Sequence, residues 1–317
     1  VGGRVIVKTE DGIESRLVCI DRDLLVIPSL AIHMDRTLNS GHAFNPQVDM
    51  QPLYGLEGSK PFPALLAEAA SVKEEDIVDF DLSLYTRQAP TRIGPDGELF
   101  MAPRIDDLEC AATTLYGFLD AAPETDSACA PVWAMFDNEE VGSSTRQGAD
   151  SSFLRDVLDR ILNAIPHSAQ AQAQAFANSF VLSADNAHAV HPNFADKADP
   201  CNKVILGKGV VVKVNASQKY TTSGLTGAIF KEICRKNNVP VQVFANRADL
   251  PGGSTLGNLA MAQVSMNCVD IGLPQLAMHS CYETAGARDT VSLIRLMEEF
   301  YASHFEETAS GTLTISK

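Results

Sequence analysis

Apolar and polar positions follow two different patterns along the chain, and the change between them falls near residue 80. In the first part, short apolar runs separated by turn residues predict strands, and the turn around Asp11-Gly12 predicts a hairpin. Residues 33–60, rich in Asn, Gly, Pro and Gln, predict ordered loop. The predicted elements are strands at 5–8, 16–20, 24–27 and 76–85 and a helix at 63–72.

In the second part, buried-type strands alternate with helical segments, which predicts an α/β fold with a mixed sheet covered by helices. The Ala/Gln stretch at 169–177 predicts a helix or a solvated linker. The strands are expected at 132–136, 179–183, 210–214, 241–244 and 268–272, and the helices at 108–122, 148–165, 223–237, 256–266 and 287–306. We therefore expect a smaller, mainly β domain over residues 1–80 and an α/β domain over residues 81–317.

Composition narrows the class of protein. The net charge of −15 disfavours nucleic acid and anionic membranes as partners, and no apolar run is long enough to span a bilayer. The seven cysteines form no C-x-x-C pair, which favours a reducing cytoplasm over a disulfide framework. An acidic substrate would need a local positive group to overcome the overall field.

Acidic residues and histidines follow the predicted strands or precede a predicted helix at four places. The first is Asp137-Asn138-Glu139-Glu140, where three carboxylates in four residues repel one another unless cations neutralise them. The alternative is a solvated acidic loop before a helix.

The other three places also have a structural alternative. Asp185 and His188 follow strand 179–183, but Asp185 suits a turn or a helix cap equally well. His279 is a single histidine in a polar loop, and Asp106 or Asp107 could cap the helix that follows. Taken together, however, carboxylates and one histidine at strand ends are what a pair of zinc ions requires, with a further Glu free to accept a proton.

The chain resembles the M18 aspartyl aminopeptidases over nearly its whole length. The matching words are GRVIVK, LAIHMDR, FNPQ, APRIDDL, DNEEVGSS, SADNAHAVHPN, VVKVN, PGGSTLGN and DIGLPQLAMHS, in family order. The resemblance implies a zinc aminopeptidase fold, two Zn²⁺ ions per subunit and release of N-terminal Asp or Glu from peptides.

The resemblance also implies a role for each matching residue. Asp106 would bridge the two metals, Glu140 and His279 would complete one, and Asp185 would serve the other. Glu139 would be the general base that activates water. The remaining roles concern substrate: Lys213 would pair with its acidic side chain, His188 would line the pocket, and Gly252 and Gly253 would form the pocket floor. For Lys213 the alternative is a lysine that merely extends from a strand end.

Residues 1–80 resemble the family's assembly module, in which the residue matching His33 reaches a neighbouring subunit. A dimer-based dodecamer is expected from this resemblance. The family's remaining zinc ligand is a His in an H-x-D word before GRVIVK, and this sequence opens with Val1, so we expect that ligand to be missing from it. Asp107 in place of Asn, and Tyr282 in place of Arg, are departures that bear on specificity.

Two other functions stay open. One is an aminopeptidase with neutral specificity. The other is a non-catalytic scaffold with an incomplete metal site, which the missing histidine favours and the presence of Glu139, Glu140, Asp185 and His279 disfavours.

Overall fold

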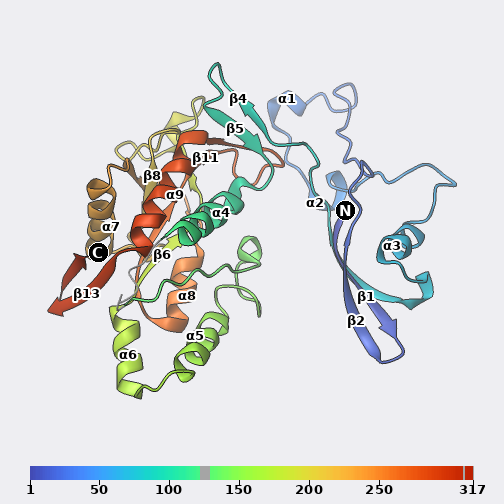
Figure 1. Cartoon of the computed structure of the whole chain (residues 1–317). Coiled ribbons are helices and arrows are strands. Elements are labelled where there is room, and N and C mark those ends of the chain that lie inside the picture. The colour runs from blue at the N-terminus through green and yellow to red at the C-terminus, as the bar shows by residue number, and fades with distance from the viewer. Residues whose placement is uncertain (122–128, 310, 317) are drawn as a thin grey trace. The chain divides into compact units, whose positions relative to one another are not determined.

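The computed structural model describes residues 1–121, 129–309 and 311–316. The chain divides into two compact units, Val1–Arg87 and Gln88–Lys317 (Figure 1). The boundary expected after residue 80 falls inside strand β3 (Ile77–Ser83), so the division lies a little further along the chain.

The first unit is built on a three-stranded antiparallel sheet of order β2-β1-β3. β1 (Gly2–Thr9) and β2 (Gly12–Cys19) form the predicted hairpin, with Thr9 opposite Gly12. Val5 and Val7, two residues apart on β1, lie on the same face of the sheet and pack with Leu66 of helix α3 (Phe62–Ala70). α3 covers that face of the sheet. This small apolar cluster holds the sheet and helix together.

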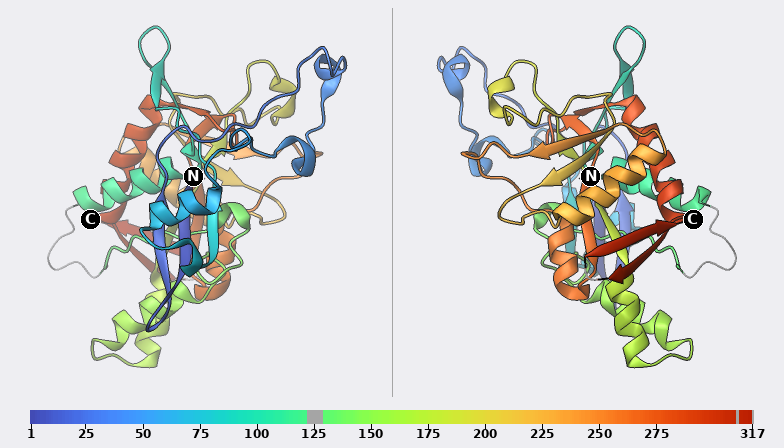
Figure 2. Two further views of the ribbon diagram at one scale, coloured as in Figure 1. Left: turned by 90° about the vertical axis from the view of Figure 1, so that its right-hand side faces the viewer. Right: turned by 90° about the vertical axis from the view of Figure 1, so that its left-hand side faces the viewer.

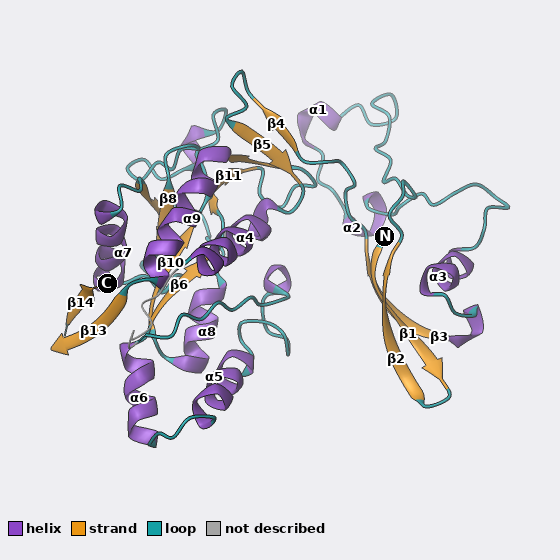
Figure 3. Cartoon of the chain, in the orientation of Figure 1, coloured by secondary structure: helices purple, strands orange, loops and turns teal. Residues whose placement is uncertain are grey.

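The long connection between β2 and α3 is mostly loop, as Figure 3 shows. It contains two single-turn helices, α1 (Leu38–Gly41) and α2 (Pro46–Asp49), and the short 3₁₀ helix η1 (Glu74–Asp76) follows α3. The strand expected at 24–27 is wrong: only the isolated bridge Val26–Leu53 forms there. An apolar run forms a β-strand only where a neighbouring strand pairs with it along its length, and residues 24–27 have a single bridged partner in the described part of the chain.

The second unit contains a four-stranded mixed sheet of order β6-β10-β8-β9. β10 runs parallel to β6 and antiparallel to β8, and β8 runs parallel to β9. This confirms the predicted mixed sheet. The strands are β6 (Phe180–Ala184), β8 (Val210–Val214), β9 (Val241–Ala245) and β10 (Asn267–Gly272).

The two faces of this sheet are covered by different helices. One face packs against α7 (Gly224–Lys236) and α9 (Ala287–Tyr301) through Val210, Val212, Val269 and Ile271. Phe230 of α7 is fully buried in this core. α4 (Ile105–Asp120) packs along α9. On the opposite face, α8 (Leu256–Val264) approaches β10 so closely at Gly257 that a Cβ would meet the Asp270 carboxylate. The helix predicted at 148–165 corresponds to α5 (Phe153–Asn163). The Ala/Gln stretch at 169–177, for which a helix or a solvated linker was expected, forms α6 (Ala169–Asn178).

The strand expected at 132–136 is wrong in this structure. Residues 129–136 carry no strand, and Val132 and Met135 are 48% and 59% exposed. The outer stripe of α5 also exposes Phe153, Val157 and Ile161. The apolar composition of 132–136 fits a strand, but no neighbouring strand pairs with it within the described residues.

Several short strands were not predicted. A second sheet of order β4-β5-β12-β11-β7 joins β4 (Thr91–Ile93), β5 (Leu99–Ala102), β7 (Ala187–His188), β11 (Pro274–Leu276) and β12 (Glu283–Gly286). The predicted helix at 287–306 ends at Tyr301, and β13 (His304–Ala309) then pairs with β14 (Thr312–Ser316), a hairpin visible in red in the right-hand view of Figure 2. The remaining 3₁₀ helices are η2 (Glu139–Val141) and η3 (Ala195–Lys197).

None of the helices in the described part of the chain has the length and apolar character needed to cross a membrane.

Candidate metal centre and active site

A pocket of about 330 Å³ in the second unit collects residues from segments that are far apart in the sequence. They come from the start of α4, from η2, from the ends of β6 and β8, and from the turn between β11 and β12. Eight residues singled out from the sequence line it: Asp106, Glu139, Glu140, Asp185, His188, Lys213, Gly253 and His279.

Two expected site residues do not line this pocket. Gly252 lies next to the lining residue Gly253, and its carbonyl accepts a hydrogen bond from Lys219 Nζ at 2.8 Å. His33 is an exposed residue of the first unit.

Asp106, Glu140 and His279 form one group of potential metal ligands, with donor atoms within 4.8 Å of one another. His279 Nε2 lies 3.2 Å from Asp106 Oδ2 and 3.1 Å from Glu140 Oε2. Imidazole nitrogen and carboxylate oxygen are the donors that zinc uses in proteins.

A second group shares Asp106 and adds Asp107 and Asp185, again with donor atoms within 4.8 Å of one another. Asp106 therefore belongs to both groups. Its Oδ1 is buried and meets no hydrogen-bond donor among the described residues. A buried acceptor without a donor is costly unless a cation satisfies it, so the residues present fit a bound metal pair.

The electrostatics of the pocket support the same fit. Burial, followed by the charges of Asp185 and Glu140, raises the pKa of Asp106 to about 8. Burial and the same two neighbouring acids raise the pKa of Glu139 to about 7. Burial also raises the pKa of Asp107 and of Glu140 above the usual carboxyl range. Such crowded acids are protonated or neutralised by cations.

Lys213 is the buried cation of the pocket. Its side chain is 3% exposed, and its Nζ donates to Asp185 Oδ2 at 2.8 Å. Burial disfavours its charge, but the Asp185 carboxylate more than compensates and holds the pKa of Lys213 above its ordinary value. Tyr220 adds a ring face at 5.7 Å from Nζ. The sequence predicted Lys213 as a partner of the substrate; its ion pair with Asp185, an expected metal ligand, was not predicted.

Sequence reasoning missed other residues of the site. Asp107 was noted as a possible helix cap and as a departure from the family, but not as a potential metal ligand. Tyr220 and Phe244 line the pocket without belonging to any of the polar segments singled out from the sequence. Glu283 was also missed, although it lies only four residues after His279. Its buried carboxylate contacts the backbone of two potential ligands.

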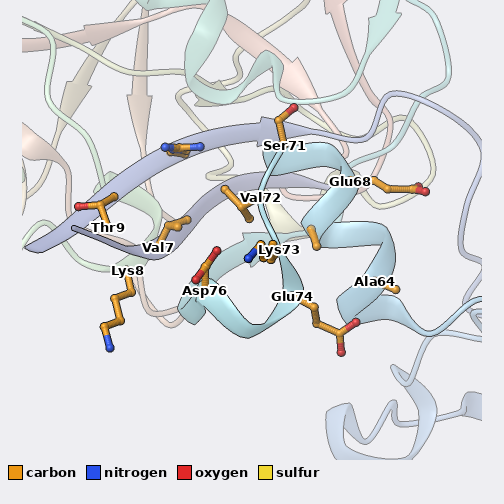
Figure 4. Close-up of a pocket in the computed structure, with 12 residues that line it drawn as sticks. Val7, Lys8, Thr9, Ala64, Glu68, Ser71, Val72, Lys73, Glu74 and Asp76 are labelled. Carbon is orange, nitrogen blue, oxygen red and sulfur yellow. The ribbon is translucent and has the colours of Figure 1, made fainter. Parts of the chain in front are cut away.

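The first unit has a hollow of its own, between the β1–β2 hairpin and the end of α3 (Figure 4). Its volume is larger, about 670 Å³. Charged side chains of both signs line it, including Lys8, Lys73, Glu68 and Asp76. None of the predicted site residues lines this hollow. The chemistry therefore points to the smaller pocket of the second unit.

Comparison with known proteins agrees with this geometry. Residues 1–301 match the family model described as aminopeptidase I zinc metalloprotease (M18). A probable M18 family aminopeptidase 2 of Clostridium acetobutylicum is 41% identical over 308 residues, which cover 95% of this chain and 70% of that relative.

The solved structures that are similar over 95% of this chain include the following two. The chain in the cryo-EM structure of the Ape4 and Nbr1 complex has a TM-score of 0.88 and 37% identity, with 62% of its length covered. The S. cerevisiae mApe1 dodecamer has a TM-score of 0.75 and 25% identity, with 68% covered.

An α/β unit with an acid-rich pocket and two donor groups that share a carboxylate is typical of a metallohydrolase. The chain belongs to the M18 family of zinc metallo-aminopeptidases, hydrolases that act on peptide bonds.

Proposed function

We propose that the protein is a two-zinc aminopeptidase that releases acidic residues from peptide N-termini. The observation that carries this proposal is the shared position of Asp106 in two donor groups of one pocket. Asp106, Glu140 and His279 would hold one zinc ion, and Asp106 and Asp185 would hold the other. When bound, zinc supplies Lewis-acid polarisation of the scissile carbonyl and of the attacking water.

Glu139 is the proposed general base. It lines the same pocket but belongs to neither donor group, so its carboxylate is free to exchange a proton. It accepts a proton from water at a carboxylate oxygen and passes it to the leaving amine. Acids around the pocket also attract the free ammonium of a peptide N-terminus, which favours removal of the terminal residue over internal cleavage.

Lys213 is the proposed partner of the acidic substrate side chain. An ammonium group has three N–H donors, and Asp185 accounts for one contact. In a chain of net charge −15, this buried ammonium would be the local positive group that an incoming carboxylate needs, in addition to its contact with Asp185.

Replacing Lys213 by alanine tests the specificity. We expect the ratio of kcat/KM for acidic over neutral N-terminal residues to fall at least about tenfold, since losing a buried charge contact costs roughly 2 kcal/mol or more. Removing Lys213 also removes a contact of Asp185, which would lower kcat/KM for every substrate. The ratio to a neutral substrate cancels that common effect and leaves the change in specificity. Lys208, an exposed lysine of the same unit, provides the control Lys208→Ala, for which the ratio should not change. An unchanged ratio in Lys213→Ala would instead favour the enzyme of neutral specificity.

We further propose that the second metal receives its remaining ligand from polypeptide equivalent to the part of the relatives that this chain does not cover. The second donor group consists of three carboxylates without a histidine. The exposed Val132 and Met135 offer an apolar strand partner to such polypeptide. If that ligand is never supplied, the incomplete site favours the scaffold function.

Self-association is proposed for the first unit, which contains the residues 1–80 expected from the sequence to form the assembly domain. The similar mApe1 structure is a dodecamer. The unit exposes the edges of β2 and β3 and the side chains of Ile13 and Leu17 on its sheet. His33 would extend from this unit to a neighbouring subunit. Light scattering coupled to size exclusion should give the mass of twelve copies; a monomer mass would contradict this proposal.

A further inference from the structure

Glu283 is a buried carboxylate that contacts the main chain of two proposed ligands at once. The residue is 2% exposed and opens strand β12. Its Oε2 accepts a hydrogen bond from the backbone N–H of Asp106 at 3.0 Å, and its Oε1 accepts one from the backbone N–H of His279 at 2.6 Å. The two oxygens therefore connect segments that are 177 residues and four residues away in the sequence.

Both segments have backbone conformations that local preference does not favour. His279 has φ of +66° and Ala277 has φ of +57°, in the left-handed region that costs about 1 kcal/mol or more for residues other than glycine. Asp106 lies in the first turn of α4 but has non-helical backbone angles, and Arg104 before it is also left-handed. These conformations persist only where other contacts fix them.

The contacts made by Glu283 are suited to that task. Hydrogen bonds from N–H groups to an ionised carboxylate are stronger than those to neutral acceptors. In the resulting arrangement Asp106 Oδ2 and His279 Nε2 are 3.2 Å apart and belong to the same donor group. Glu283 itself belongs to neither donor group, and each of its oxygens is already occupied by a backbone donor.

We propose that Glu283 is the positioning residue of the metal centre, which sets the separation of Asp106 and His279 and thereby the zinc affinity of their group. This inference rests on the proposed function, because it takes Asp106 and His279 as zinc ligands.

The test is the zinc affinity of Glu283→Gln, measured by competition with a colorimetric chelator. The amide keeps the size of the side chain but has one acceptor oxygen, and its NH₂ group faces a backbone N–H donor. We expect the affinity to fall by about 10- to 100-fold, the range for residues that orient metal ligands.

Asp289 offers a matched control. It is 1% exposed, and its two oxygens accept backbone N–H groups of Gly207 and Gly209 at 2.6 and 2.7 Å. Asp289→Asn therefore makes the same chemical change at a carboxylate whose partners do not line the pocket. Its zinc affinity should equal that of the wild type, although its thermal stability should fall.

The outcomes are distinguishable. Weaker zinc binding in Glu283→Gln with unchanged binding in Asp289→Asn supports the inference. Equal binding in Glu283→Gln and wild type overturns it and leaves the proposed function intact, as does an equal loss in both variants. A wild type that binds no zinc overturns both proposals. If Glu283→Gln does not fold, Glu283→Asp replaces it: this variant keeps the charge, but its oxygens are one methylene further from the two N–H groups, and the same loss is expected.

Discussion

Replacing Glu139 by glutamine should lower the turnover of the zinc-loaded holoenzyme by about 10²- to 10⁴-fold, the usual contribution of a general base. Glutamine has the shape of glutamate but cannot accept a proton at neutral pH. Glu139 lines the pocket and belongs to neither group of potential ligands, so zinc content should stay at the wild-type level. The measurements are kcat on a peptide with an acidic N-terminus and zinc per chain.

Asp137 provides the control for this variant. It is an exposed acid two residues earlier on the same loop and does not line the pocket. Asp137→Asn should therefore leave kcat within about threefold of the wild type, as expected for a surface substitution. Wild-type turnover in Glu139→Gln would show that another group accepts the proton. Loss of zinc from that variant would show that Glu139 is a ligand.

Asp106→Asn is expected to remove zinc from both positions at once. Asp106 is the residue common to the two donor groups: its Oδ2 lies 3.2 Å from His279 Nε2, and its buried Oδ1 meets no hydrogen-bond donor among the described residues. Asparagine retains the shape but loses the charge that holds the cations. We expect the zinc content to fall from two ions per holoenzyme chain to fewer than one, measured by atomic emission after dialysis.

The same substitution should have the opposite effect on protein stripped of zinc. There Asp106 is a crowded, largely buried acid whose pKa is raised to about 8, so its charge opposes folding at higher pH. Asn removes that charge, and the chelator-treated variant should melt no lower than the chelator-treated wild type. Full zinc retention by Asp106→Asn would contradict the shared-ligand arrangement. A lower melting temperature of the stripped variant would mean that Asp106 stabilises the fold without metal.

The sequence predicted elements well where a segment carries its own periodicity. α7, α9 and β10 lie close to their predicted ranges because each has a continuous apolar face. The strand at 132–136 was predicted incorrectly because a strand also needs a hydrogen-bonded neighbour, which composition does not report. β7 and β11, only two and three residues long, were missed because alternation cannot be seen over such lengths.

The site shows the same distinction. Asp106, Glu140, Asp185 and His279 belong to words of the family resemblance, and the structure brings them into one pocket, although their roles stay proposals. The Lys213–Asp185 ion pair was not predicted, because Asp185 follows β6 and Lys213 lies on β8, two strands that only the folded sheet brings to either side of β10. Glu283 was missed for a different reason: it acts on backbone N–H groups, and those partners leave no trace in residue identity.

The central claim is that the acidic pocket of the second unit holds zinc. The most direct measurement is an anomalous difference map, collected above and below the zinc absorption edge, from crystals of the holoenzyme. The proposal predicts a zinc peak in contact with Asp106, Glu140 and His279 and a second one beside Asp106 and Asp185. A zinc-saturated crystal without a peak at Asp106 would contradict it.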